Sequence, residues 1–346
     1  MSTPGRGTGA TPASDLGERG LIERIRRMLP SPPSDLLVGP GDDAAVVRPE
    51  RGAFDILTTD ALVEGVHFDF SFSTPTDVGH KALAINLSDV ASMGGTPRFA
   101  LLSLMIPASC SLEAFDGLLE GFLTLAGRSR VAVAGGNISR SPGPLVVDVT
   151  VTGSARPRKI LTRAGGRPGD RLYVSGTIGA SSAGLWWLQR HAGAGEVAEP
   201  DGAVLECVQR HRRPEPRVRL GAVIGRTRAA NACMDLSDGL ADAIRQVAEA
   251  SGTGARIEAD RLPIDQGARE IFSGAGKDPV ESALAGGDDY ELLFAVPARF
   301  KGRFRAAGRL AQGLSLTHIG ELTADRSLVV IQNGTEAALP HGFAHF

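Results

Sequence analysis

The sequence predicts a mixed α/β (α+β) protein of two domains. Short apolar runs alternate with segments of helical period in both halves, and a basic stretch rich in Pro and Gly separates the halves. The length of 346 residues favours more than one domain, and a hydrophobic fraction of 42% can support a sizeable core. The 44 glycines follow no three-residue period, which excludes collagen, and the aliphatic content excludes a disordered chain.

The first half begins with a stretch rich in Gly, Thr, Pro and Ser, and we expect a disordered tail over residues 1–16. Apolar residues at helical spacing predict helices over 17–29, 77–93 and 112–127. Apolar and alternating runs predict strands over 44–47, 54–58, 63–70, 100–106, 131–134 and 145–152.

Residues 156–171 carry six basic side chains among Pro and Gly, as expected of a crossing between domains. We therefore expect an N-terminal domain over 17–155 and a C-terminal domain over 156–346. The second half predicts strands over 171–175, 255–258, 292–296 and 328–332, and helices over 181–191, 217–225 and 240–251. Residues 233–239 are expected to form a loop that leads into the last of these helices.

Composition also excludes several classes of protein. A net charge of −2 argues against a protein that coats nucleic acid. The three cysteines, Cys110, Cys207 and Cys233, form no CxxC pair, so neither a zinc site nor a disulfide framework is predicted. The uncharged stretch 172–189 is too rich in Gly and Ser to span a membrane, and the N-terminus lacks the apolar core of a signal peptide. We expect a cytoplasmic protein without a membrane partner.

Aspartates recur in turns at the ends of apolar runs. They lie in five short segments, 39–44, 58–60, 86–89, 234–239 and 286–291. Loops at the ends of elements commonly form sites, and carboxylates brought together repel each other unless cations lie between them. Oxygen ligands without clusters of His or Cys favour Mg²⁺, which usually bridges carboxylates to phosphates of a substrate.

Two phosphate-binding motifs are excluded. Residues 39–44 fit G-x-G-x-x-A, but Asp42 and Asp43 would repel a pyrophosphate unless a metal intervened. Gly276 and Lys277 do not complete a Walker A motif, because Ile271 and Asp278 stand where Gly and Ser or Thr are required. An ATP site in this chain would therefore depend on metals and scattered loops.

The segments 41–45, 58–68, 81–94, 161–163, 235–240 and 286–292 closely resemble, in order, the motifs of the thiamine-monophosphate kinase family. The resemblance covers roughly residues 18–346. It implies a two-domain fold like that of aminoimidazole-ribonucleotide synthetase, with an N-terminal mixed sheet that pairs in a homodimer and a C-terminal α/β sandwich. It also implies transfer of the γ-phosphoryl group of ATP to thiamine monophosphate with several Mg²⁺ ions. A phosphate acceptor has a second pKa of about 6, so no general base is required.

The resemblance also implies roles for individual residues. The Mg²⁺ ligands would be Asp42, Asp43, Thr58, Thr59, Asp60, Asp89, Asn137, Asp235 and Asp238. Gly136, Asn137, Arg163 and Ser237 would contact ATP, and His67, Asp288 and Phe343 would contact thiamine monophosphate. Four alternatives stay open at this point: Asp42 could cap a turn, His67 could be structural, Arg163 could be a solvated linker charge, and Phe343 could pack on the core.

One position departs from the family pattern. Asn137 stands where the family commonly has Asp, and its neutral amide oxygen can bind Mg²⁺ with less electrostatic attraction. Two other functions are therefore weighed beside the kinase: another ATP-using enzyme of the superfamily, and a non-catalytic protein that binds a nucleotide or a thiamine phosphate. The otherwise intact acidic positions favour the kinase.

Overall fold

The computed structural model describes residues 11–191, 200, 202–311 and 314–343. Most of the expected tail (residues 1–10) lies outside this range, and its last residues differ from the expectation. Ala13–Leu16 form a 3-10 turn, η1, in which Ala13 is buried and donates a 2.9 Å backbone hydrogen bond to Cys110.

The chain divides into two compact units that are interleaved in sequence. The smaller unit contains residues 1–49, 59–83 and 99–150, and the larger unit contains 50–58, 84–98 and 151–346. Two stretches of the N-terminal half, 50–58 and 84–98, therefore belong to the same unit as the C-terminal half. The domain boundary expected between residues 155 and 156 stays a prediction.

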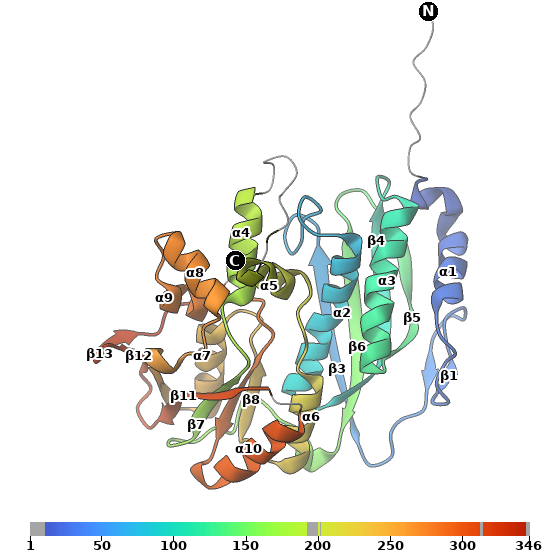
Figure 1. Cartoon of the computed structure of the whole chain (residues 1–346). Coiled ribbons are helices and arrows are strands. Elements are labelled where there is room, and N and C mark those ends of the chain that lie inside the picture. The colour runs from blue at the N-terminus through green and yellow to red at the C-terminus, as the bar shows by residue number, and fades with distance from the viewer. Residues whose placement is uncertain (1–10, 192–199, 201, 312–313, 344–346) are drawn as a thin grey trace, which may run out of the picture. The chain divides into compact units, whose positions relative to one another are not determined.

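A four-stranded sheet has the order β3-β6-β4-β5, in which β4 and β5 are parallel (Figure 1). Its strands are β3 (Phe54–Val63), β4 (Thr96–Pro107), β5 (Ala132–Ser141) and β6 (Val146–Ala155). The helices of this part of the chain are α1 (Gly17–Met28), α2 (Pro75–Ser92) and α3 (Leu112–Ser129). A short hairpin pairs β1 (Leu36–Val38) with β2 (Val46–Val47).

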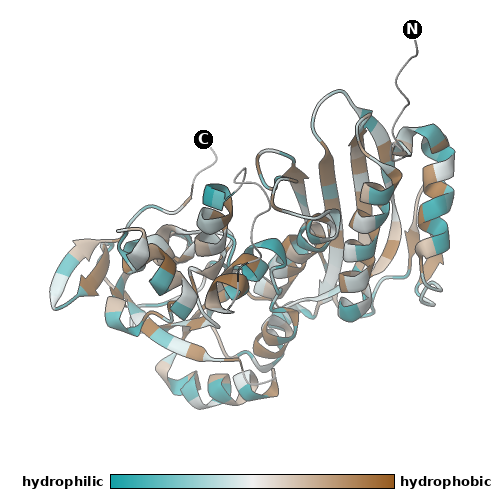
Figure 2. Ribbon diagram, turned by 45° about the horizontal axis from the view of Figure 1, so that its top comes forward, coloured by the Kyte–Doolittle hydropathy of each residue, from teal (hydrophilic) through white to brown (hydrophobic). Residues whose placement is uncertain are grey.

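Helices α2 and α3 pack closely because Gly79 has no side chain. A Cβ atom at Gly79 would lie 1.9 Å from the backbone oxygen of Leu118. Helix α1 differs from them: it buries only Leu21 and is mostly teal in Figure 2, the colour of hydrophilic residues. Arg24 of α1 forms a bidentate ion pair with Asp116 of α3, which connects this polar helix to the rest of the smaller unit.

The larger unit contains a seven-stranded sheet of order β13-β12-β9-β11-β7-β10-β8. Its strands are β7 (Arg171–Ser175), β8 (Ala232–Asp235), β9 (Gly254–Glu258), β10 (Leu292–Val296), β11 (Leu316–Thr323), β12 (Leu328–Gln332) and β13 (Thr335–Ala338). Its helices, besides part of α2, are α4 (Ala180–His191), α5 (Gly202–Arg212), α6 (Val218–Thr227), α7 (Leu240–Ser251), α8 (Gln266–Gly274), α9 (Pro279–Ala285) and α10 (Lys301–Leu310). Single 3-10 turns are η2 (Pro157–Lys159), η3 (Ala259–Arg261) and η4 (Ala298–Phe300).

Both faces of strand β10 in this sheet are buried. Leu293 and Ala295 of β10 pack into one core with residues of α4, α7, α8 and α9, while Leu292, Phe294 and Val296 pack into a second core with α6 and α10. A strand covered on both faces reads as a continuous apolar run instead of an alternating one. This explains why 292–296 was recognised from sequence.

The mixed α/β class expected from the sequence is confirmed, and two local expectations are wrong in addition to the end of the tail. The strand expected over 63–70 does not form: β3 ends at Val63, and the chain then turns at Gly65, whose φ of +81° is incompatible with an extended strand. Residues 233–239 were expected to be a loop, but β8 continues through Asp235, antiparallel to β10 with Asp235 opposite Leu292. The strand was missed because it is only four residues long and fully buried, so it shows no alternation. Asp235 is thus the last residue of β8, an edge strand of the sheet, and helix α7 begins five residues later at Leu240.

Candidate active site

The centre of the candidate site in the larger unit is a pair of carboxylates, Asp235, which is buried, and Asp89, which is half-buried. Asp235 is 3% exposed and accepts a 2.7 Å hydrogen bond from the hydroxyl of Ser88, which is fully buried on α2. Asp89, the next residue of α2, accepts a hydrogen bond from the hydroxyl of Thr58 on β3. Burial and, next in size, the charge of Asp89 raise the pKa of Asp235 above its usual range. The site therefore holds two acidic side chains that destabilise each other in the absence of a cation.

Arg163 lies close enough to this pair to act on it. Its segment is fixed on both sides: Leu161 donates a 3.0 Å backbone bond to Met93 after α2, and Cys233 of β8 donates a 2.9 Å bond to Thr162. The guanidinium contacts the side-chain oxygen of Gln246 on α7. Its positive charge partly opposes the upward shift in the pKa of Asp235. Arg163 thus lies beside Asp235 at an exposed position, and its role toward ATP stays a prediction.

Three segments that were singled out from sequence converge through backbone hydrogen bonds. The N–H of Asp288 donates to the backbone oxygen of Ser237 at 2.7 Å, and the N–H of Phe343 donates to that of Asp238 at 3.1 Å. Ser237, Asp238 and Asp288 are half-buried, and Phe343 is 57% exposed. The expected ATP and metal loop therefore adjoins the two expected substrate contacts of the larger unit. Since Phe343 is mostly exposed, its ring is not packed into the core.

The smaller unit holds the other predicted residues in more open positions. Asp42 and Asp43 are exposed, and a carboxylate oxygen of Asp42 accepts a 2.8 Å hydrogen bond from the N–H of Asp43. This contact is local to two adjacent residues, and the role of Asp42 stays a prediction. Thr59 is exposed on β3 and Asp60 follows it, half-buried. The hydroxyl of Thr59 donates to a carboxylate oxygen of Asp148 at 3.1 Å.

His67 helps to close a turn. Its N–H donates to the backbone oxygen of Val63 at 2.9 Å, and its Nδ1 accepts a 3.1 Å bond from the N–H of Val63. Accepting at Nδ1 leaves the proton of a neutral imidazole on Nε2. The side chain therefore has a structural role in this turn, and its role toward a substrate stays a prediction.

Gly136 and Asn137 lie exposed on β5, paired in parallel register with Leu102 and Ser103 of β4. A Cβ atom at Gly136 would lie 1.9 Å from the backbone oxygen of Leu102. Only glycine fits there without displacing a strand, so this glycine is explained by the sheet itself. Asn137 follows it on a rigid strand.

Sequence reasoning missed several polar residues near these positions. Asp148 was missed because its strand was predicted from the alternation of apolar residues alone. An acidic residue between two valines would have been a signal for a functional side chain. Ser88 was missed because its partner is 147 residues away. Among the described residues, no group of three or more His, Cys, Asp or Glu side chains has the arrangement of a metal site. Asp89 and Asp235 with nearby hydroxyls nevertheless suit a hard cation that takes its remaining ligands from water and phosphate.

No helix in the described part of the chain is long and apolar enough to cross a membrane.

Comparison with known proteins identifies the class to which this chain belongs. Residues 41–155 match the family described as AIR synthase related protein, N-terminal domain, and residues 167–333 match its C-terminal domain. The two matches cover most of the chain and define it as an AIR synthase related protein.

Curated relatives narrow this class. The thiamine-monophosphate kinase of Escherichia coli (strain K12) is 36% identical over 337 residues, 95% of this chain and 98% of the relative. That of Bacillus subtilis (strain 168) is 37% identical over 266 residues, 76% of this chain and 78% of the relative. The chain belongs to the thiamine-monophosphate kinase family.

Solved structures agree. The crystal structure of thiamine-monophosphate kinase from Stenotrophomonas maltophilia K279a has a TM-score of 0.80 at 35% identity and covers 92% of this chain and 96% of its own. The structure of AaThiL complexed with AMPPCP and TMP has a TM-score of 0.75 at 34% identity and covers 98% of this chain and 100% of its own.

Proposed function

We propose that this chain transfers the γ-phosphoryl group of ATP to the phosphate of thiamine monophosphate and releases thiamine diphosphate and ADP. An oxygen of the acceptor phosphate forms the new bond to the γ-phosphorus, while the bond from that phosphorus to the β,γ-bridging oxygen breaks. The acceptor is mostly ionised near neutral pH, so the side chains need only align two anions and offset their repulsion. Membership of the kinase family supports this reaction.

The observation that carries the proposal is the adjacency of the segments around Ser237, Asp288 and Phe343 in the larger unit. Ser237 is proposed to contact ATP, and Arg163 to bind its phosphates, a role suited to a permanently charged and planar guanidinium. Asp288, as a carboxylate, would repel a phosphate. It is therefore assigned to the cationic or N–H-donating rings of the thiamine moiety, on whose face the exposed Phe343 ring is proposed to stack.

Mg²⁺ is part of the proposal. When bound, it would neutralise charge on the transferring phosphates. Asp89 and Asp235 would hold it with Asp238 and Thr58 in the larger unit. The ligands proposed from the smaller unit are Asp42, Asp43, Thr59, Asp60 and Asn137, with His67 and Gly136 assigned to thiamine monophosphate and ATP, respectively. The raised pKa of Asp235 supports this assignment, because a cation would relieve the repulsion that raises it.

A homodimer is also proposed. Strand β3 lies at one end of the four-stranded sheet, and its Phe54 and Leu57 are 57% and 72% exposed. Exposed apolar side chains on an edge strand are a hazard unless a partner covers them. Light scattering after gel filtration should give twice the chain mass, and Leu57→Lys should give a monomer. A monomeric wild type would contradict this part. The cytoplasmic location stays a prediction.

The decisive experiment incubates the purified protein with ATP, Mg²⁺ and thiamine monophosphate and follows thiamine diphosphate by chromatography. We expect turnover in the wild type and at least 100-fold less in Asp89→Asn, with unchanged circular dichroism. Aminoimidazole-ribonucleotide synthetase substrates serve as the comparison for another superfamily enzyme. Tight binding of both ligands without any product would instead support the non-catalytic binding protein.

A further inference from the structure

The segment Gly286–Glu291 holds two side chains in a backbone conformation that such residues rarely adopt. It connects α9 to β10, and within it Asp288 has φ +67° and Tyr290 has φ +50°. The left-handed region is disfavoured by any Cβ atom. Arg130 and Arg228 also adopt it, but each ends a helix, where the conformation is common. Two such residues within one loop require other contacts to hold them.

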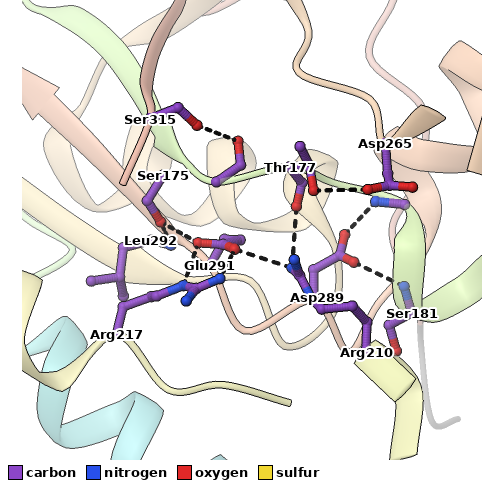
Figure 3. A network of polar contacts seen from close by, with 12 residues as sticks. Ser175, Thr177, Ser181, Arg210, Arg217, Asp265, Asp289, Glu291, Leu292 and Ser315 are labelled. Carbon is purple, nitrogen blue, oxygen red and sulfur yellow. Dashed lines mark hydrogen bonds and ion pairs between the residues drawn. The ribbon is translucent and has the colours of Figure 1, made fainter. Parts of the chain in front are cut away.

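Those contacts come from the acidic residues on either side of Tyr290. Asp289 is 2% exposed and accepts hydrogen bonds from the N–H groups of Gly179 at 2.6 Å and Ser181 at 3.2 Å, at the start of α4. These contacts are drawn in Figure 3. The side chain of Asp289 thus anchors the middle of the segment to the first turn of α4.

Glu291 anchors the end of the segment. Its fully buried carboxylate lies between two guanidinium groups (Figure 3). Arg217 donates through Nε at 2.8 Å and also through Nη2, Arg210 donates through Nη2 at 3.0 Å, and the hydroxyl of Ser175 donates at 2.5 Å. A backbone hydrogen bond joins the same segment to the residue after β8: the N–H of Tyr290 donates to the backbone oxygen of Leu236 at 3.0 Å.

The consequence of this anchoring is the direction of the Tyr290 side chain. Its hydroxyl donates a 3.0 Å hydrogen bond to Oδ1 of Asp288, and Nδ1 of His211 lies 3.8 Å from Oδ2 of the same carboxylate. Tyr290 is 7% exposed and His211 is 4% exposed, whereas the side chain of Asp288 is 34% exposed. A carboxylate open to solvent therefore accepts a hydrogen bond at Oδ1 from the buried Tyr290 hydroxyl, while its Oδ2 faces the buried imidazole of His211.

The geometry of Ser181, His211 and Asp288 excludes a catalytic triad. The hydroxyl of Ser181 lies 3.2 Å from Nδ1 of His211, the same nitrogen that faces Asp288. A triad needs its nucleophile and its carboxylate on opposite nitrogens of the imidazole. The group around Asp288 therefore orients this carboxylate and activates no nucleophile.

We infer that Tyr290 is a positioning residue that fixes the substrate-binding carboxylate of Asp288, and that the left-handed backbone of 288–290 exists to bring its hydroxyl onto that carboxylate. The inference rests on the proposed function, in which Asp288 contacts the thiamine moiety. A carboxylate that is already fixed loses less conformational entropy when the substrate binds. Tyr290 should therefore affect the affinity for thiamine monophosphate. ATP affinity and the rate of the chemical step do not depend on it.

The test is Tyr290→Phe, which removes only the hydroxyl. The chain offers a matched control in its second tyrosine, Tyr173 of β7, which is 2% exposed and packs against Phe304 in the same unit. We expect Tyr290→Phe to raise KM for thiamine monophosphate about 10-fold, equivalent to about 1.4 kcal/mol. Its kcat and KM for ATP should stay within about twofold of wild type, and calorimetric Kd for thiamine monophosphate should rise in parallel. Tyr173→Phe should change none of these.

A double-mutant cycle with Asp288→Asn separates positioning from a general structural effect. If Tyr290 acts through Asp288, its substitution should have little further effect on KM in the Asp288→Asn background, while additive effects would overturn the inference. An unchanged KM in Tyr290→Phe, with KM raised in Asp288→Asn, would also overturn it and leave the proposed function standing. No effect of Asp288→Asn would overturn the substrate role of Asp288 itself. If Tyr290→Phe lowers the melting temperature, the calorimetric Kd for thiamine monophosphate is measured below that temperature. The outcomes described for KM then apply to Kd.

Discussion

The hydroxyl of Ser88 on α2 donates a hydrogen bond to Oδ2 of Asp235 at the end of β8, two residues that are 147 positions apart in the chain. This bond connects the N-terminal stretch 84–98 of the larger unit to its C-terminal sheet at the point where Asp89 faces Asp235. The two carboxylates are consequently held together by the fold, although their charges repel. Such an arrangement costs stability in the ligand-free protein, and under the proposed function a bound cation would relieve this cost.

Asp235→Asn should therefore stabilise the ligand-free protein and inactivate it. The substitution removes a buried charge beside Asp89, while its amide oxygen can still accept from Ser88. We expect the free energy of unfolding without Mg²⁺ or ATP to rise by about 1 kcal/mol, and turnover to fall at least about 100-fold. Urea denaturation and the kinase assay measure the two effects.

The matched control is Asp260→Asn, which changes an exposed aspartate in η3 of the same unit. It should alter neither quantity. A less stable Asp235→Asn protein would show that this carboxylate is stabilising in the ligand-free state, contrary to our interpretation.

Arg163→Lys tests whether the guanidinium binds phosphate. A lysine keeps the positive charge beside Asp235 but loses the planar fork that holds two phosphate oxygens. We expect KM for ATP to rise about 10-fold with little change in KM for thiamine monophosphate. Arg158→Lys, at an exposed position of η2, is the control and should behave as wild type. An equal KM for ATP in the two variants would show that Arg163 is a solvated charge of the linker and does not bind phosphate.

Asn137→Asp restores the acid that the family pattern commonly has. Asn137 lies on β5 beside Ser103, so the substitution changes a ligand charge without disturbing a loop. A carboxylate attracts Mg²⁺ more strongly than an amide oxygen does. We expect activity to be kept and the Mg²⁺ concentration for half-maximal rate to fall about 3-fold or more. Complete inactivity of this variant in a Mg²⁺ titration would argue against a ligand role.

Gly136→Ala should destabilise the four-stranded sheet. Its Cβ atom would lie 1.9 Å from the backbone oxygen of Leu102, so β5 would have to move away from β4. Overpacking of this kind costs about 1–3 kcal/mol, which calorimetry would record as a lower melting temperature. Gly143→Ala is the control, because a Cβ atom at Gly143 meets nothing within 4 Å. Similar melting temperatures for both variants would mean that the sheet adjusts at little cost.

The sequence allowed the fold class and many elements to be predicted because the strands covered on both faces are continuous apolar runs and several helices keep the helical period. It also predicted Asp89 on a helix, three residues after Asn86. It could not predict Ser88 as the partner of Asp235, or Arg217 as the partner of Glu291, because these pairs are 147 and 74 residues apart and no local pattern relates them. The left-handed φ of Tyr290 likewise depends on tertiary contacts, since nothing in the local sequence favours it.

Asp289 should make stability depend on pH between about pH 4 and pH 7. Burial raises the pKa of its carboxyl from 3.8 to about 7, while the charge of Arg210 and the two backbone N–H donors oppose this and the charge of Glu291 adds to it. The folded protein therefore keeps a proton that the unfolded chain loses near pH 4. Stability from this residue is present at low pH and is lost as pH rises through about 7.

Asp289→Asn removes that titration, so the comparison of wild type with variant isolates it. We expect the free energy of unfolding of wild type to decrease relative to that of the variant by about 2–3 kcal/mol between pH 5 and pH 8, since each unit of pKa shift is worth about 1.4 kcal/mol. Urea denaturation at several pH values measures this difference, and the exposed Asp260→Asn variant should follow wild type. A difference that stays constant with pH would show that Asp289 is ionised throughout, its charge held by Arg210 and the N–H groups of Gly179 and Ser181.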